Sequence, residues 1–126
     1  MNKKKILIVD DEKEMVEVET LRLKASGYDV LAAHDGESGL KAAQEWQPDL
    51  VILDIMLPLM DGYQVCQALK SSEKCRRIPI ILVSAMDGKL DTTLLKKSGA
   101  DFYITKPFEP PVLLDKIRDL LRKNQS

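Results

Sequence analysis

The stretch KILIVDD, residues 5–11, decides the fold, because an unbroken apolar run of strand length ends abruptly in acidic residues. A run with β-branched members and no polar alternation is typical of a strand covered on both faces, as in a parallel sheet. The same pattern returns at residues 50–54, which end in Asp54, and at residues 80–84, which end in Ser84. The sequence therefore predicts buried parallel strands with polar residues at their carboxyl ends.

Amphipathic segments and helix-ending residues separate these runs. After the first strand, Met15, Val18, Leu21 and Ala25 recur at helical spacing, which predicts a helix with these residues on its apolar face and an end at Gly27. Further strands are expected at residues 28–33 and 102–105. The remaining predicted helices carry Leu40, Ala43 and Trp46, then Val65 and Leu69, then residues 90–98, and finally Leu113, Ile117, Leu120 and Leu121.

Five strand–helix units in succession predict a doubly wound α/β fold, with a five-stranded parallel sheet and helices on both faces. The chain has 126 residues and is 44% hydrophobic, which suits one domain over residues 1–126. A closed barrel would need more units than five.

The charge balance argues against two classes of partner. Nineteen Lys and Arg stand against 20 Asp and Glu, so the net charge is -1 and no overall field attracts nucleic acid or anionic lipid. The apolar runs are far shorter than the roughly 20 residues of a membrane helix. We therefore expect a cytoplasmic protein without direct DNA binding. Cys66 and Cys75 are expected to be reduced thiols, and the lone His34 excludes a site with two imidazoles.

Polar residues follow the predicted strands at one edge of the sheet. They are Asp10 and Asp11, Asp54, Ser84 and Lys106. In an open α/β sheet, ligands bind outside the carboxyl ends of the strands. Carboxylates this close repel one another unless a cation neutralises them, and an open site with only oxygen ligands suits Mg²⁺. A lysine beside that cation favours a phosphoryl group as the ligand. Each residue alone has an ordinary explanation as a cap or turn former, but their shared location favours a site.

Four segments together resemble the receiver domain of two-component response regulators, over essentially the whole chain. They are residues 6–12 with the acidic doublet, residues 48–62 around Asp54, residues 80–85 with a hydroxyl on the fourth strand, and residues 103–108 with an aromatic residue, a lysine and a proline. The resemblance implies a flavodoxin-like (βα)5 fold with strand order 2-1-3-4-5.

The resemblance also implies a role for each site residue. Asp54 is expected to be the phosphoacceptor, with a phosphohistidine on a sensor histidine kinase or phosphotransfer protein as donor. Asp11, Asp54 and the backbone carbonyl of Met56 are expected to bind Mg²⁺ directly and Asp10 through water, with Mn²⁺ able to substitute. Lys106 is expected to stabilise the charge on the transferring group.

The resemblance further implies a switch. Ser84 and Tyr103 are expected to rearrange on phosphorylation and to change the face of the fourth helix, fifth strand and fifth helix, where a downstream protein or a second copy would bind. Lys106-Pro107 is expected to be a cis peptide. Met56 and Met86 carry no group that positions water, which predicts slow loss of the phosphoryl group.

Two other classes remain as alternatives. A haloacid-dehalogenase-like phosphatase would need a second aspartate where Met56 stands, and a flavodoxin-like flavin binder would place a phosphate against residues 10–12, which are acidic. Turnover catalysis is therefore disfavoured, and without a Walker lysine loop the use of ATP is not expected. Whether the chain works alone or as a piece of a longer regulator stays open at this stage.

Overall fold

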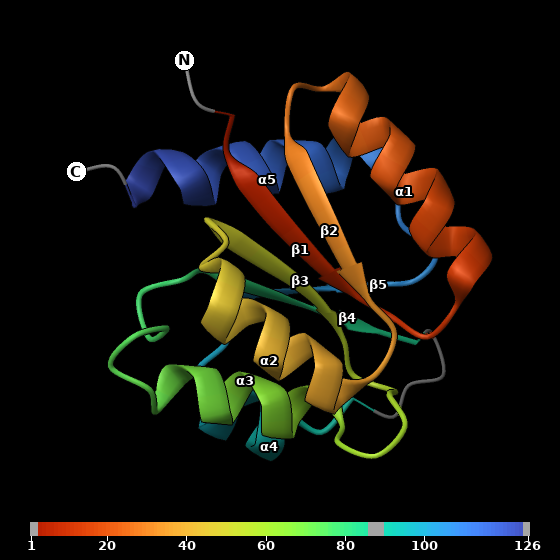
Figure 1. Cartoon of the computed structure of the whole chain (residues 1–126). Helices are drawn as coiled ribbons and strands as arrows, with labels where there is room; N and C mark the ends of the chain where they lie inside the picture. Colours follow the sequence, from red (N-terminus) through yellow and green to blue (C-terminus); the bar gives the residue numbers. More distant parts are fainter. Residues whose placement is uncertain (1–2, 86–89, 125–126) are drawn as a thin grey trace.

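The computed structural model describes residues 3–85 and 90–124, in which five strands alternate with five helices (Figure 1). The strands are β1 Lys5–Val9, β2 Asp29–Ala33, β3 Leu50–Asp54, β4 Ile80–Ser84 and β5 Phe102–Thr105. The helices are α1 Lys13–Ala25, α2 Gly36–Trp46, α3 Gly62–Lys70, α4 Thr92–Ser98 and α5 Pro110–Lys123. None of the described helices has the length and apolar character needed to cross a membrane.

The strands form one parallel sheet in the order β2-β1-β3-β4-β5, which confirms the predicted fold class and strand order. Val9 of β1 pairs with Leu53 of β3, and Asp54 of β3 pairs with Val83 of β4. This register brings the last residues of β1, β3 and β4 to the same edge of the sheet, where the polar residues that follow them can meet.

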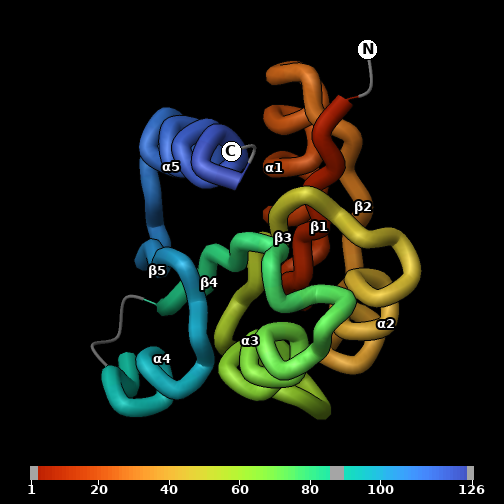
Figure 2. Tube along the Cα trace, turned by 90° about the vertical axis from the view of Figure 1, so that its left-hand side faces the viewer, coloured from red at the N-terminus to blue at the C-terminus, as the bar shows by residue number. Residues whose placement is uncertain are grey.

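Two cores cover the two faces of the sheet. Helices α1 and α5 lie on one face, and α2, α3 and α4 lie on the other (Figures 1 and 2). Alternate strand residues point to opposite faces, so Ile8 and Ile52 pack toward α1 and α5 while Val9 and Leu53 pack toward α2 and α3. Burial on both faces explains why the central strands are apolar without alternation.

The predicted apolar face of α1 was wrong. Val18 and Leu21 are 45% and 70% exposed, and the buried residues of α1 are Val16, Glu19 and Leu23. Met15 is half-buried and Ala25 is exposed. The predicted residues and the buried residues both recur at helical spacing along α1. The buried set was harder to recognise, because it includes the charged residue Glu19. Its carboxylate pairs with Arg22 at 2.9 Å on the same helix, which is how a charged residue is accommodated there.

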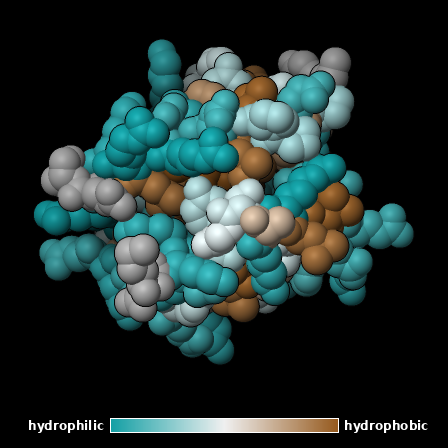
Figure 3. Space-filling view, turned by 90° about the horizontal axis from the view of Figure 1, so that it is seen from above, coloured by the Kyte–Doolittle hydropathy of each residue, from teal (hydrophilic) through white to brown (hydrophobic). Residues whose placement is uncertain are grey.

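The other helices follow their predicted faces, with small differences at the boundaries. Ala43, Val65 and Leu69 are buried, as expected, and the apolar positions of α5 are buried too. β2 begins at Asp29, one residue later than predicted, and α4 begins at Thr92, after Asp91 caps it by accepting a hydrogen bond from the Leu94 amide. Seen from above, the molecular surface is mainly hydrophilic, with apolar side chains in separate patches (Figure 3).

Candidate functional site at the carboxyl ends of the strands

The structure gathers the predicted polar residues at one edge of the sheet, which we call the carboxyl rim. Asp10 follows β1, Asp54 ends β3, Ser84 ends β4 and Lys106 follows β5. Asp10, Asp54 and Ser84 are buried, because the apolar strands that carry them lie in the middle of the sheet. The backbone holds Asp10 through its amide, which donates to the Ala33 carbonyl at 3.1 Å.

The ammonium of Lys106 lies among three carboxylates. Its Nζ is 3.1 Å from Asp10 Oδ2, 3.2 Å from Asp54 Oδ2 and 3.0 Å from Glu12 Oε1. One positive charge therefore faces three negative charges, which leaves the site with a net negative charge.

Glu12 is a site residue that the sequence reasoning missed. Oxygens of Asp10, Glu12 and Asp54 all lie within 4.8 Å of one another, whereas the exposed Asp11 is outside this group. Asp11 lines an adjacent cleft together with Glu12, Asp54 and residues of the following loop, which are Ile55, Met56, Leu57, Pro58 and Asp61. The only sequence signal for Glu12 was that it extends the acidic pair to three residues, a pattern equally typical of a helix start.

Burial and crowding change the proton affinities at the carboxyl rim. Burial, together with the negative charge of Asp10, raises the pKa of Asp54 from 3.8 to about 6, because these effects outweigh the attraction of Lys106 and a backbone hydrogen bond. For Lys106, burial alone would lower the pKa, but the hydrogen bond to Glu12 and the charges of Asp54 and Asp10 raise it well above its usual value. Both directions agree with a site that is short of positive charge.

The loop after β3 is built to hold Asp54 in place. The Met56 amide donates to Asp54 Oδ1 at 3.1 Å, and the Gly62 amide donates to the Ile55 carbonyl at 2.9 Å. A Cβ atom at Gly62 would overlap the backbone carbonyl of Asp54, and one at Gly36 would overlap the carbonyl of Met60. Glycine is therefore required where α2 and α3 begin, so that both helices can approach this loop.

The residues expected to act as a switch lie apart from each other. The Ser84 hydroxyl donates to the neighbouring Ala85 carbonyl at 3.1 Å, at the carboxyl rim. Tyr103 is partly exposed on β5, its ring stacked beside that of Phe102 at 6.4 Å. The Lys106-Pro107 bond is cis, as predicted. Met86, expected to influence loss of the phosphoryl group, lies outside the described residues, while the side chain of Met56 is exposed.

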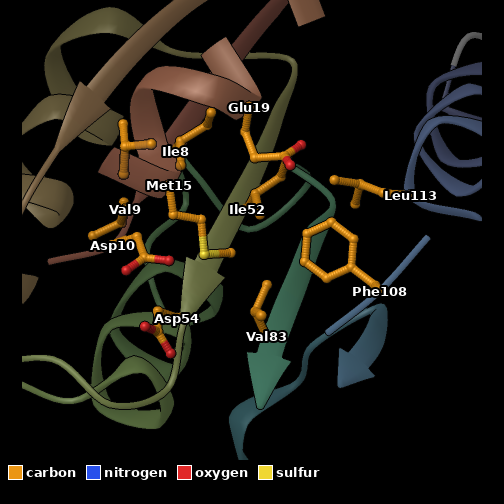
Figure 4. Close-up of a pocket in the computed structure, with 11 residues that line it drawn as sticks. Ile8, Val9, Asp10, Met15, Glu19, Ile52, Asp54, Val83, Phe108 and Leu113 are labelled. Carbon is orange, nitrogen blue, oxygen red and sulfur yellow. The ribbon is translucent and has the colours of Figure 1, made fainter. Parts of the chain in front are cut away.

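A narrow, mainly apolar pocket lies beside Asp10 and Asp54, between α1 and the start of α5 (Figure 4). Met15 and Glu19 of α1 and Phe108 and Leu113 on the α5 side line it. These apolar walls keep water from one side of the two carboxylates, which is consistent with the raised pKa of Asp54.

The sequence relatives place this geometry in a family. Residues 6–118 match the family described as "Response regulator receiver domain". The chain belongs to the response regulator receiver family. Receiver domains of this family are signalling domains of two-component systems, so the match favours a signalling protein over the phosphatase and flavin-binder alternatives.

Three receiver relatives illustrate the match. The chain is 43% identical to the alkaline phosphatase synthesis transcriptional regulatory protein PhoP of Bacillus subtilis, over 97% of this chain and 50% of that protein. It is similar in structure to a CheY-like response regulator receiver domain protein from Methanospirillum hungatei, with a TM-score of 0.91, 29% identity and 98% coverage of both chains. It also matches the receiver domain of sensor histidine kinase PA1611 from Pseudomonas aeruginosa, with a TM-score of 0.85, 30% identity and coverage of 99% and 100%; that structure has a magnesium ion coordinated in the active site cleft. The chain spans about half the length of the curated relatives it matches.

Proposed function

We propose that this receiver domain is a phosphorylation-operated switch in which Asp54 accepts a phosphoryl group from a phosphohistidine on a sensor histidine kinase or phosphotransfer protein. The observation that carries the proposal is the arrangement around Asp54, a buried carboxylate beside two further carboxylates and an ammonium at the carboxyl rim. A structural ion pair needs one carboxylate for one ammonium. The excess of negative charge is better explained by a site that receives a cation and then a phosphoryl group.

The transfer conserves bonds and charge in a simple way. A carboxylate oxygen of Asp54 forms a bond to phosphorus as the bond from phosphorus to the donor's imidazole nitrogen breaks, and that nitrogen keeps the electron pair of the broken bond. The Lys106 ammonium, held at the same edge, stabilises the negative charge on the phosphoryl oxygens. The Met56 amide, which already contacts Asp54 Oδ1, keeps the carboxylate oriented.

The donor set fits Mg²⁺. Asp10, Asp54 and the cleft residue Asp11 offer only carboxylate oxygens, which hard divalent cations prefer, and the cleft beside them is open enough to retain water. We propose that Asp11, Asp54 and the Met56 carbonyl hold the ion, that Asp10 holds it through water, and that Mn²⁺ can substitute. When bound, the ion neutralises charge on the phosphoryl group.

The signal would leave through the face formed by α4, β5 and α5. Ser84 lies where a phosphoryl group on Asp54 could recruit its hydroxyl, and Tyr103 lies on the neighbouring strand β5. Leu94, Tyr103 and Val112 expose apolar surface on this face, which suits a protein partner or a second copy of the chain. With a net charge of -1, the receiver is proposed to act through protein contacts rather than by binding DNA itself.

The direct test is phosphorylation by acetyl phosphate, followed by intact-protein mass spectrometry. We expect the wild type to gain the mass of one phosphoryl group in the presence of Mg²⁺ or Mn²⁺ and none with a chelator. Asp54→Asn should gain none. Asp61→Asn is the matched control, because Asp61 lines the same cleft as Asp54. Asp61 is the N-cap of α3, and asparagine is also a favourable N-cap residue. Equal labelling of Asp54→Asn and wild type would contradict the assignment.

A further inference from the structure

The end of β2 holds Asp10 on both sides of its Cα atom. The Asp10 amide donates to the Ala33 carbonyl at 3.1 Å, and the Asp10 carbonyl lies 3.0 Å from Nδ1 of His34. A carbonyl oxygen can only accept a hydrogen bond, so His34 carries a hydrogen on Nδ1 and donates it. The two peptide groups that flank Asp10 are therefore both held, one by Ala33 and the other by His34.

His34 supplies this donor at the point where the ladder between β1 and β2 ends. Val9 and Ala33 are the last pair of the ladder, and in this register the Asp10 carbonyl would next accept from the amide of Asp35. Asp35 is already the N-cap of α2, because the chain has left the strand by then. The ring N–H of His34 thus takes the place of the next ladder hydrogen bond.

The peptide group that His34 holds joins two residues of the proposed metal site. Its carbonyl belongs to Asp10 and its amide to Asp11, so a rotation of this planar group would move both residues. The Asp10 carboxylate is held further by the Glu12 amide, which donates to its Oδ1 at 2.9 Å. Asp11 is exposed, so its position depends on the backbone of this loop.

The order of this loop before an ion arrives affects how tightly the ion binds. Ligands that are already in place lose less conformational freedom on binding. Without the bond from His34, the loop of the metal-free protein can relax into other arrangements, and the ion must then restore the original one. Loss of the bond should therefore weaken metal binding more than it destabilises the metal-free fold.

We propose that His34 is a positioning residue for the metal site, which holds the peptide group between Asp10 and Asp11 through its ring N–H. This inference rests on the Mg²⁺ site of the proposed function. The donor carries the role, rather than the ring or its charge. A different side chain that places an N–H at the position of Nδ1 should therefore replace histidine.

The test compares His34→Asn with His34→Leu, two uncharged side chains of similar shape. Asparagine can place an amide N–H close to the position of Nδ1, whereas leucine has no donor. Mn²⁺ is titrated into each protein, and the free ion is followed by electron paramagnetic resonance. We expect the dissociation constant of His34→Leu to be roughly three- to tenfold higher than that of His34→Asn, the factor that corresponds to one hydrogen bond. His34→Asn should stay within about twofold of the wild type.

Urea unfolding in the presence of a chelator separates positioning from a purely structural role. We expect the two variants to differ less in their unfolding equilibrium constants than in their Mn²⁺ dissociation constants. If His34 only stabilises the end of β2, His34→Leu should be less stable than His34→Asn while both bind Mn²⁺ equally. That result would overturn the proposal.

A further measurement needs no metal. The Glu12 amide donates to Asp10 Oδ1, so its hydrogen exchange reports how firmly the loop is held. Measured by NMR with a chelator present, this exchange should be at least about twofold faster in His34→Leu than in His34→Asn. Equal rates would contradict the proposal. His34→Ala also lacks the donor and should behave like His34→Leu in each measurement.

Asp54→Asn distinguishes a failure of this inference from a failure of the proposed function. If the wild type binds Mn²⁺ no more tightly than Asp54→Asn does, the ion is not at the carboxyl rim, and both the proposed metal site and this inference fail. If the wild type binds more tightly but His34→Leu and His34→Asn match it, only the role of His34 fails. If both His34 variants bind equally weakly, the ring matters rather than its donor, and the proposal is likewise overturned.

Discussion

The two ends of the parallel sheet use the same residue types in opposite ways. At the carboxyl rim, three carboxylates share the ammonium of Lys106. The other end, which we call the amino rim, is where the strands begin. There Asp49, just before β3, accepts a hydrogen bond from the first amide of β1, that of Lys5, at 2.7 Å. Asp101, just before β5, accepts one from the first amide of β4, that of Ile80, at 2.8 Å.

Lysine is likewise used differently at the two rims. Lys70 donates to Asp101 Oδ2 at 2.9 Å and to the carbonyls of Ile78 and Arg76, so its charge is matched by a carboxylate and two backbone acceptors. At the amino rim Asp49, Asp101 and Lys70 each have partners of opposite polarity, which is the arrangement expected of a structural contact. At the carboxyl rim like charges crowd together, which costs stability and points to a function.

The contrast between the two rims can be tested by substitutions that change stability. The largest change in the free energy of unfolding is expected for Asp54→Asn in the presence of a chelator. A carboxyl group whose pKa is raised from 3.8 to about 6 by folding binds its proton more tightly in the folded state, so its contribution to stability falls as the pH rises from about 4 to about 6 and stays unfavourable above that. The cost at neutral pH is at most about 3 kcal/mol. Asparagine cannot ionise, so the variant should gain up to that amount at neutral pH and little near pH 4.

Urea unfolding of wild type and Asp54→Asn at the two pH values measures this gain. Saturating Mg²⁺ should narrow the difference at neutral pH, because the ion binds the folded wild type and stabilises it. A variant that is less stable than the wild type at neutral pH would show that the carboxyl rim is not strained.

The same substitution at the amino rim should act in the opposite direction. Asp101→Asn removes the charge that Lys70 faces but keeps an oxygen for the Ile80 amide, so we expect a loss of about 1–2 kcal/mol in the free energy of unfolding. The loss should not depend on Mg²⁺. Combining it with Lys70→Met should cost less than the sum of the two single changes, since both remove the same contact. Additive losses would show that the two residues are not coupled.

The smallest effect is expected in the loop that follows Asp54. Leu59 has a φ of 71°, in the left-handed region that disfavours residues with a Cβ, and is 81% exposed. Leu59→Gly removes this strain and little buried surface, so we expect the free energy of unfolding to rise by up to about 1 kcal/mol. This net gain is the strain that is relieved minus the cost of the greater freedom that glycine gives the unfolded chain. Leu21→Gly is the control: Leu21 is also exposed but helical, and glycine there should destabilise by about 1 kcal/mol.

The contrast between the rims also explains which features the sequence could predict. The ends of the strands can be predicted from the sequence, because an apolar run followed by Asp10 or Asp54 indicates both a buried strand and its polar end. Parallel pairing then brings these ends together without further information. For this reason the parallel sheet and the collection of Asp10, Asp54, Ser84 and Lys106 at one edge were predictable from the residues, whereas the strand order came from the family resemblance.

Two features depended on packing and could not be predicted. The buried face of α1 was assigned wrongly, because a carboxylate at Glu19 is buried there while Leu21 is exposed. Glu12 was missed, because spacing along the chain says where a residue stands but not how far its side chain reaches. Its carboxylate spans the gap to Lys106, which is 94 residues away in sequence.

The glycines at the starts of α2 and α3 have a consequence for transplanting this loop into other proteins. Gly36 lets α2 approach the carbonyl of Met60, and Gly62 lets α3 approach the carbonyl of Asp54. The shape of the loop is thus defined by two neighbouring helices as well as by its own residues. A designer who grafts residues 54–62 onto a different α/β scaffold must also graft the first turn of α2, including Gly36. Without that turn, the loop that supports Asp54 loses one of the two helices that define its shape.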